Sequence, residues 1–130
     1  MNGKDNFLLD TNVVLGFLNG NSKISDFFEK KLMQSTLHVS QITRMKLLGY
    51  SGITSEEEKH LKKFLSYVKV LPINDAVCDQ AITLRREKKL KLPDALIAAT
   101  AICFDLMLVT CDSDLLDKNS HFRSMNPITA

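Results

Sequence analysis

Residues 91–114 read KLPDALIAATAICFDLMLVTCDSD, and this stretch decides the fold class. Its first part, residues 94–104, predicts a helix that is apolar on nearly every side, and such a helix is buried. Pro93 suits the first turn of that helix. The short apolar run at residues 107–109 follows after a brief connection and predicts a strand. A buried helix that leads directly into a short strand is typical of an α/β fold.

The same alternation of strands and helices extends over the rest of the chain. Further strands are predicted at residues 7–9, 37–39 and 69–73, with a short fifth one that includes Ile128. Helices are predicted at residues 13–18, 22–33, 41–48, 54–67 and 74–89. Their predicted N-terminal signals are Ser22 or Ser25, Ser40, the capping box Thr54–Glu57, and Asn74. Short strands that alternate with helices predict a three-layer α/β/α domain with a central parallel sheet of four to five strands.

Length and composition are those of one ordinary globular domain over residues 1–130. The net charge of +2 permits RNA binding but does not argue for it. Three cysteines without a CxxC pair favour a reducing compartment: Cys78, Cys103 and Cys111. The chain enters its first strand without an apolar signal region, and its longest apolar stretch, residues 95–109, is too short to span a bilayer comfortably. We therefore expect a cytoplasmic protein with no membrane partner.

Four aspartates lie where apolar strands end or where the buried helix begins: Asp10, Asp94, Asp112 and Asp114. In an open α/β sheet, side chains at the carboxyl ends of strands point into the crevice that binds ligands. Each aspartate also has a purely structural interpretation, as a helix cap, a turn former or a complement to the helix dipole. Their shared placement favours one acidic site.

Several carboxylates in one crevice need a hard cation, most plausibly Mg²⁺ or Mn²⁺. Asp10, Asp94 and Asp112 are the candidate metal ligands, in a site that hydrolyses a phosphodiester. Asp114, or whichever carboxylate does not bind the metal, is the candidate proton acceptor. Four polar residues are candidates for orienting the carboxylates or the phosphate, with helix capping as the alternative role: Thr11, Asn12, Ser40 and Thr110.

Four blocks of the sequence resemble the PIN domain family, and specifically the VapC-type toxins of bacterial toxin–antitoxin pairs. The blocks are LLDTNVVL (8–15), VSQITRMKLLGY (39–50), KLPDALIAATA (91–101) and LVTCDSD (108–114). DTN alone is a weak signal, but the four blocks together, in the family's order and spacing, cover essentially the whole chain. The resemblance implies a Mg²⁺- or Mn²⁺-dependent ribonuclease with an RNA substrate. It also implies a homodimer that is silenced by a cognate antitoxin, which inserts a tail into the acidic groove.

One position departs from the family pattern. Lys46 occupies the place where the family has a second acidic residue, a glutamate. A positive charge beside a divalent cation weakens metal binding, and we expect the Lys46 ammonium to pair with Asp10 or Asp94. Three explanations remain open: a solvated lysine with the metal held by the aspartates alone, a naturally degenerate site, or an inactivating substitution.

Two basic features accompany the acidic residues. Arg44 is expected near the entrance of the groove, where it is a candidate contact for RNA phosphate or antitoxin carboxylates. The basic run at residues 85–91 is interpreted as a solvated helix end, with contact to RNA phosphates as the alternative.

The leading functional prediction is a metal-dependent endoribonuclease toxin. The alternative is a catalytically degenerate PIN module that binds antitoxin or RNA without cleaving it. A receiver-like phosphoacceptor is disfavoured because the third strand supplies no aspartate, only Asn74. The chain also lacks the GxxxxGK[ST] loop of nucleoside triphosphatases.

Overall fold

The computed structural model describes residues 6–32, 35–117 and 121–129. Within these residues the elements follow in this order: β1 (Asn6–Leu9), α1 (Thr11–Leu18), α2 (Ser22–Phe27), the π-helical turn η1 (Phe28–Leu32), β2 (Thr36–Ser40), α3 (Gln41–Leu48), α4 (Ser55–Leu65), β3 (Lys69–Leu71), α5 (Asp75–Lys88), α6 (Leu92–Cys103), β4 (Met107–Val109), α7 (Ser113–Asp117) and β5 (Ser124–Met125).

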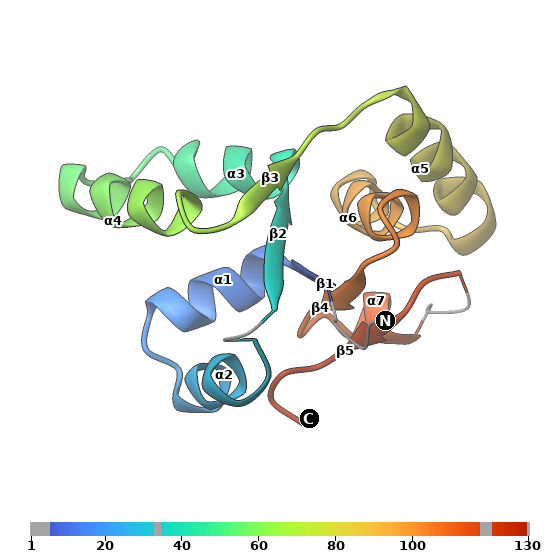
Figure 1. The fold of residues 1–130 in the computed structure, drawn as a ribbon. Helices are drawn as coiled ribbons and strands as arrows, with labels where there is room; N and C mark the ends of the chain where they lie inside the picture. Colours follow the sequence, from blue (N-terminus) through green and yellow to red (C-terminus); the bar gives the residue numbers. More distant parts are fainter. Residues whose placement is uncertain (1–5, 33–34, 118–120, 130) are drawn as a thin grey trace.

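The strands form one sheet in the order β3-β2-β1-β4-β5, and every neighbouring pair is parallel. Helices α1 to α4 lie on one side of this sheet, and α5 and α6 lie on the other (Figure 1). The predicted three-layer α/β/α architecture with a parallel sheet is confirmed.

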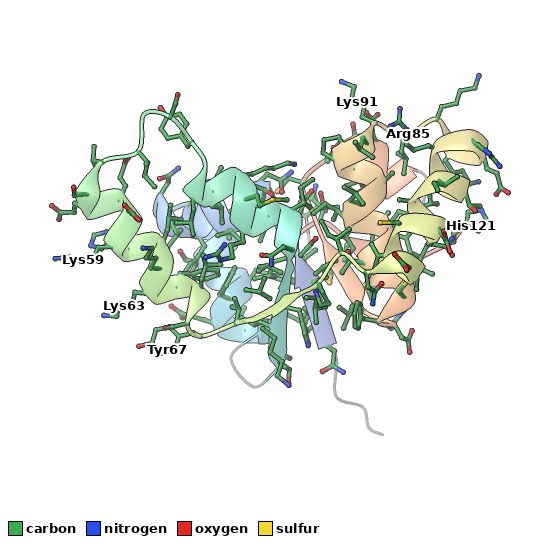
Figure 2. The ribbon with its side chains drawn as sticks, turned by 90° about the horizontal axis from the view of Figure 1, so that it is seen from above. Lys59, Lys63, Tyr67, Arg85, Lys91 and His121 are labelled. Carbon is green, nitrogen blue, oxygen red and sulfur yellow. The ribbon has the colours of Figure 1, made fainter. Side chains whose placement is uncertain are left out.

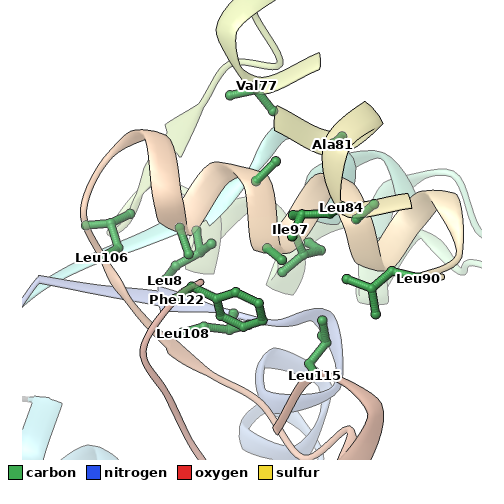
Figure 3. Close-up of a cluster of buried hydrophobic side chains, with 14 residues drawn as sticks. Leu8, Val77, Ala81, Leu84, Leu90, Ile97, Leu106, Leu108, Leu115 and Phe122 are labelled. Carbon is green, nitrogen blue, oxygen red and sulfur yellow. The ribbon is translucent and has the colours of Figure 1, made fainter. Parts of the chain in front are cut away.

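The sheet is buried on both faces because successive residues of a strand point to opposite sides. Leu8 and Leu108 pack against α5 and α6 in one core cluster, which also contains Leu84 and Ile97 (Figure 3). The neighbouring Phe7, Leu9 and Val109 belong instead to a second cluster with residues of α1, α2, α3 and α4. Burial of each such side chain contributes about 1.5–3 kcal/mol to folding.

The two helical layers extend the molecule in opposite directions from the sheet. Figure 2 shows Lys59, Lys63 and Tyr67 at one end and Arg85 and Lys91 at the other. The first group belongs to α4 and the residues that follow it, and the second to α5 and the turn between α5 and α6.

Local capping signals locate most helix starts correctly. Thr54 and Glu57 form the predicted reciprocal capping box. The side chain of Ser40 caps α3, and the side chain of Asn74 caps α5. Helix α6 begins at Leu92, with Pro93 in its first turn, and is buried along most of its length as expected.

Some predicted boundaries were wrong. Asn21 caps α2, not Ser22 or Ser25, and the helix passes into the η1 turn after Phe27. The predicted end of this helix at Met33 lies outside the described residues. The fifth strand is Ser124–Met125 and does not include Ile128, which is exposed.

Two further predictions require correction. Strand β3 ends at Leu71, because Pro72 has no backbone N–H to continue the ladder. Helix α4 ends at Leu65, two residues short of the predicted end. All three cysteines are free thiols, as their spacing indicated.

Candidate active site

Asp10, Asp112 and Asp114 follow the carboxyl ends of β1 and β4, which are adjacent strands in the sheet, and Asp94 lies in the first turn of α6. Asp10 follows β1 directly, and Asp112 follows β4 by three residues. This is also the point where the strand order changes direction, because β2 lies on one side of β1 and β4 on the other. Open α/β sheets form their ligand-binding crevice at such a point.

Asp10 is buried, with 5% of its surface exposed, and both oxygens of its carboxylate accept hydrogen bonds. The Thr11 backbone N–H donates to Oδ1 at 2.7 Å, and the Thr110 hydroxyl donates to Oδ2 at 2.7 Å. The Asn12 amide donates to Oδ2 at a longer 3.5 Å. Asp10 therefore caps α1, as its structural interpretation proposed, and at the same time joins β1 to β4.

Thr110 connects Asp10 to the other strand-end aspartates. Its hydroxyl accepts the Asp112 backbone N–H at 3.0 Å while it donates to Asp10. Asp112 Oδ1 in turn accepts the Asp114 backbone N–H at 2.9 Å, which caps the start of α7. The loop after β4 is thus fixed relative to Asp10 by a chain of hydrogen bonds.

The four aspartates act on one another electrostatically. Burial raises the pKa of the Asp94 carboxyl, and the charges of Asp112, Asp10 and Asp114 raise it further. Burial also raises the pKa of Asp10, which the Thr110 and Thr11 hydrogen bonds partly offset. The structure therefore brings residues that are about 100 positions apart in the sequence into one electronegative region.

Lys46 belongs to the same region. Its positive charge lowers the pKa of both Asp10 and Asp94, against the effect of burial. The expected direct ion pair is absent, however: Lys46 has no carboxylate partner in the described part of the chain. Its exposed side chain acts on the aspartates at longer range.

The residue types fit a hard divalent cation, because three carboxylates supply the oxygen ligands that Mg²⁺ and Mn²⁺ prefer. Their arrangement is less complete. Across residues 6–32, 35–117 and 121–129, no three histidine, cysteine or acidic side chains are positioned together as a ready-made metal site. Asp10, Asp94 and Asp112 would therefore have to draw closer to share one ion.

The candidate orienting residues divide into two groups. Thr110 and Asn12 both donate hydrogen bonds to the Asp10 carboxylate. Asn12 also accepts the Cys111 backbone N–H at 3.2 Å, which ties it to the loop after β4. Thr11 contacts Asp10 through its backbone only. Its hydroxyl instead pairs with the buried Thr43 at 3.1 Å, a contact that the sequence did not reveal.

Ser40 and Arg44 lie outside this network of contacts. Ser40 is buried and caps α3 through the Ile42 N–H at 3.2 Å, which supports its alternative role. Arg44 is exposed on α3 and does not line the groove beside the site.

A groove of about 810 Å³ opens beside the acidic region, between α1, α3 and α4. Thr11 and Lys46 line it at the end next to the aspartates. Its other lining residues are mostly apolar or aromatic: Leu15, Phe17, Leu18, Asn19, Leu47, Tyr50, Ile53, Glu57, His60, Leu61, Lys63, Phe64 and Tyr67. Such an exposed apolar surface is typical of a binding site.

The family model of the PIN domain matches residues 7–120, which is most of the chain. The chain belongs to the PIN domain family. Comparison with curated protein sequences gave no match.

Solved structures agree with this assignment. A chain of the toxin–antitoxin complex from Klebsiella pneumoniae is 26% identical, with a TM-score of 0.79 over 92% of this chain and 96% of that one. DNA-bound VapBC from Salmonella typhimurium is 23% identical, with a TM-score of 0.80 over 95% and 98%. FitAcB from Neisseria gonorrhoeae is 23% identical, with a TM-score of 0.78 over 93% and 97%. The predicted membership of the PIN domain family is confirmed, and the chain has the same fold as the chains of these complexes.

No helix in the described ranges has both the length and the apolar character that a bilayer span requires.

Proposed function

We propose that this PIN domain is the ribonuclease subunit of a toxin–antitoxin pair and hydrolyses RNA phosphodiesters in the presence of Mg²⁺ or Mn²⁺. The observation that carries the proposal is the placement of Asp10, Asp112 and Asp114 just after β1 and β4, with Asp94 in the first turn of α6 close enough for their charges to raise its pKa. Membership of the PIN family and the similarity to chains of toxin–antitoxin complexes support it.

Each residue has a definite role in this proposal. Asp10, Asp94 and Asp112 would hold the ion, which when bound polarises the scissile phosphate and lowers the pKa of water. Thr110 and Asn12 keep the Asp10 carboxylate in place through their hydrogen bonds. The exposed Asp114 accepts the proton of the attacking water as the new P–O bond forms and the bond to the leaving oxygen breaks.

Lys46 favours a second candidate function, a PIN module that binds RNA or antitoxin without cleaving it. Its charge opposes a divalent cation at the site, and no ready-made metal site exists among the described residues. In this case the acidic region keeps its fold but has lost catalytic power.

An RNA cleavage assay distinguishes the two candidates. Wild type, Lys46→Glu and Asp94→Asn are incubated with labelled single-stranded RNA and structured tRNA over a Mn²⁺ titration. The ribonuclease proposal predicts cleavage by wild type at high Mn²⁺, by Lys46→Glu at lower Mn²⁺, and none by Asp94→Asn. Cleavage by Lys46→Glu alone favours the degenerate module, and no cleavage by either protein refutes the ribonuclease assignment.

We further propose that the groove between α1, α3 and α4 receives an apolar helical segment of the cognate antitoxin. Helix-in-groove recognition requires an open apolar surface, and Leu15, Tyr50 and Tyr67 expose 43%, 61% and 75% of their surface there. Because Thr11 and Lys46 lie at one end of the groove, a bound segment would also reach the acidic region.

The predicted homodimer and cytoplasmic location belong to the same proposal. The dimer is tested by light scattering after size-exclusion chromatography, where we expect twice the 14.6 kDa mass of the chain. A mass equal to one chain at all concentrations would contradict it.

A further inference from the structure

The turn between α5 and α6 concentrates positive charge. Residues 85–91 contain five cations and one anion, a net charge of +4, whereas the whole chain carries +2. All other residues together therefore carry −2. The cations, here called the basic turn, are Arg85, Arg86, Lys88, Lys89 and Lys91.

Topology places the basic turn at the same edge of the sheet as the aspartates. Helix α6 precedes β4, a strand of a parallel sheet, so the N-terminus of α6 lies toward the carboxyl ends of the strands. Asp94 is in the first turn of α6, three residues after Lys91. Only residues 89–91 separate α5 from α6, and the two helices pack side by side, so the C-terminus of α5 lies at this edge too (Figure 1).

The basic turn is held rigidly. Lys89 has a left-handed backbone, with φ of 56°, which ends α5 sharply. Leu90 is only 4% exposed and packs into the core cluster beneath α5 and α6 (Figure 3). Lys89 and Lys91 lie on either side of the buried Leu90 and are themselves exposed. Because Leu90 fixes the backbone between them, less conformational entropy is lost when a ligand binds there.

The fold itself does not account for all of these charges. Arg85, Arg86 and Lys88 complement the dipole at the C-terminus of α5. Lys91, in contrast, occupies the N-cap of α6, makes no capping hydrogen bond and opposes the dipole. The five cations form no ion pair within the described part of the chain, where the neighbouring Glu87 faces His121 at 3.5 Å.

We propose that the basic turn binds the phosphates of single-stranded RNA and guides the strand to the aspartates beside it. The choice of RNA rests on the proposed function, and the site rests on the charge, position and rigidity of the turn. The aspartates repel a polyanion such as RNA, and unpaired cations next to them supply the attraction that binding requires. Phosphate contacts of this kind fix the register of the strand without reading its sequence.

The test measures RNA binding in EDTA, so that cleavage plays no part. Fluorescence anisotropy follows a labelled twelve-nucleotide RNA on wild type and on the double variant Arg85→Gln/Lys91→Gln. The matched control, Lys23→Gln/Lys59→Gln, removes the same charge from exposed positions on α2 and α4, on the other side of the sheet and outside the groove (Figure 1). We expect the basic-turn variant to bind the RNA about tenfold more weakly than wild type. The slope of log Kd against log salt concentration should fall by about 1.4, because two phosphate contacts are lost.

Each alternative outcome has a defined meaning. Equal losses in the basic-turn and control variants, or no loss in either, overturn the inference, and so does tighter binding of a DNA of the same sequence. Arg85→Lys/Lys91→Arg keeps the charges and must keep the affinity, which shows that the loss follows the charge and not the identity of the side chains. If RNA binds through the basic turn but is not cleaved, this inference stands and the proposed hydrolysis is refuted. If RNA is cleaved but the basic-turn variant binds it as tightly as wild type, the hydrolysis stands and this inference is refuted.

Discussion

The Thr110 hydroxyl donates a 2.7 Å hydrogen bond to Asp10 Oδ2 and so joins the ends of β4 and β1 across 100 residues of sequence. The same hydroxyl accepts the Asp112 N–H. One threonine thus satisfies a buried carboxylate and positions the loop that carries two further aspartates. This side-chain contact adds to the backbone hydrogen bond from Asp10 N–H to the Val109 carbonyl and fixes the carboxylate of Asp10 relative to the loop after β4.

Replacing Thr110 with valine tests that dependence. Thr110→Val keeps the shape but leaves the Asp112 N–H without its partner and Asp10 Oδ2 with only the long Asn12 contact, so we expect a loss of about 2–3 kcal/mol in the free energy of unfolding. Thr100→Val is the matched control, because the Thr100 hydroxyl contacts only the Leu96 carbonyl of its own helix. Urea unfolding measures both, and an equal or larger loss for Thr100→Val would contradict the account.

Asp10→Asn should stabilise the protein at neutral pH. Burial raises the pKa of Asp10, so ionisation at neutral pH costs folding free energy that asparagine does not incur. Asparagine is also an equally good helix cap. The asparagine NH2 group cannot accept the Thr110 hydroxyl, which offsets part of the benefit, so we expect a net gain below about 1 kcal/mol at pH 7.

The pH dependence of this gain gives a sign test. The folded-state pKa of Asp10 is raised, so its contribution to stability is present at acid pH and is lost as pH rises through that pKa. The advantage of Asp10→Asn should therefore shrink as pH falls toward the ordinary value of 3.8. Urea unfolding at several pH values tests this, with exposed Asp79→Asn as the control; a less stable Asp10→Asn protein at pH 7 would be evidence against it.

Lys46 should set the affinity for divalent cations. Removing its charge in Lys46→Gln should tighten Mn²⁺ binding by about threefold to tenfold, which corresponds to about 1 kcal/mol, and Lys46→Glu should tighten it further. Isothermal titration calorimetry measures this without RNA. The control Lys59→Gln removes an equal charge from α4 and should leave the Mn²⁺ affinity unchanged. An unchanged Mn²⁺ affinity in Lys46→Gln would show that Lys46 does not act on the cation site.

Two exposed apolar residues, one inside the groove and one outside it, test whether the antitoxin binds there. Leu15 is 43% exposed and lines the groove, whereas Ile82 is 50% exposed on α5 and does not. Leu15→Lys should weaken binding of the cognate antitoxin by at least about tenfold, which is the size of effect expected for a central contact. Ile82→Lys should leave binding unchanged, and equal effects in the two variants would show that the antitoxin does not occupy the groove.

Features that depend on neighbouring residues were predictable from the sequence. These features each depend on residues close together in the sequence: the Thr54–Glu57 capping box, the Ser40 and Asn74 caps, and the apolar character of α6. The strand-end position of Asp10 also follows from local pattern, because an apolar run of three residues ends directly before it.

Features that depend on packing between distant segments were not predictable. The groove is formed by the packing of α1, α3 and α4 against one another, and no local sequence pattern indicates how these helices pack. The contact between Thr11 and Thr43 crosses from α1 to α3 for the same reason. Strand β5 has only two residues, too few for a periodic signal, so Ile128 was assigned to it wrongly.

Crystals soaked in Mn²⁺ test the central claim, that the separated aspartates form one cation site, most directly. The account predicts an anomalous peak bounded by Asp10, Asp94 and Asp112, weak in wild type because of Lys46 and strong in Lys46→Glu. An empty site in both proteins, with these aspartates still apart, would contradict it.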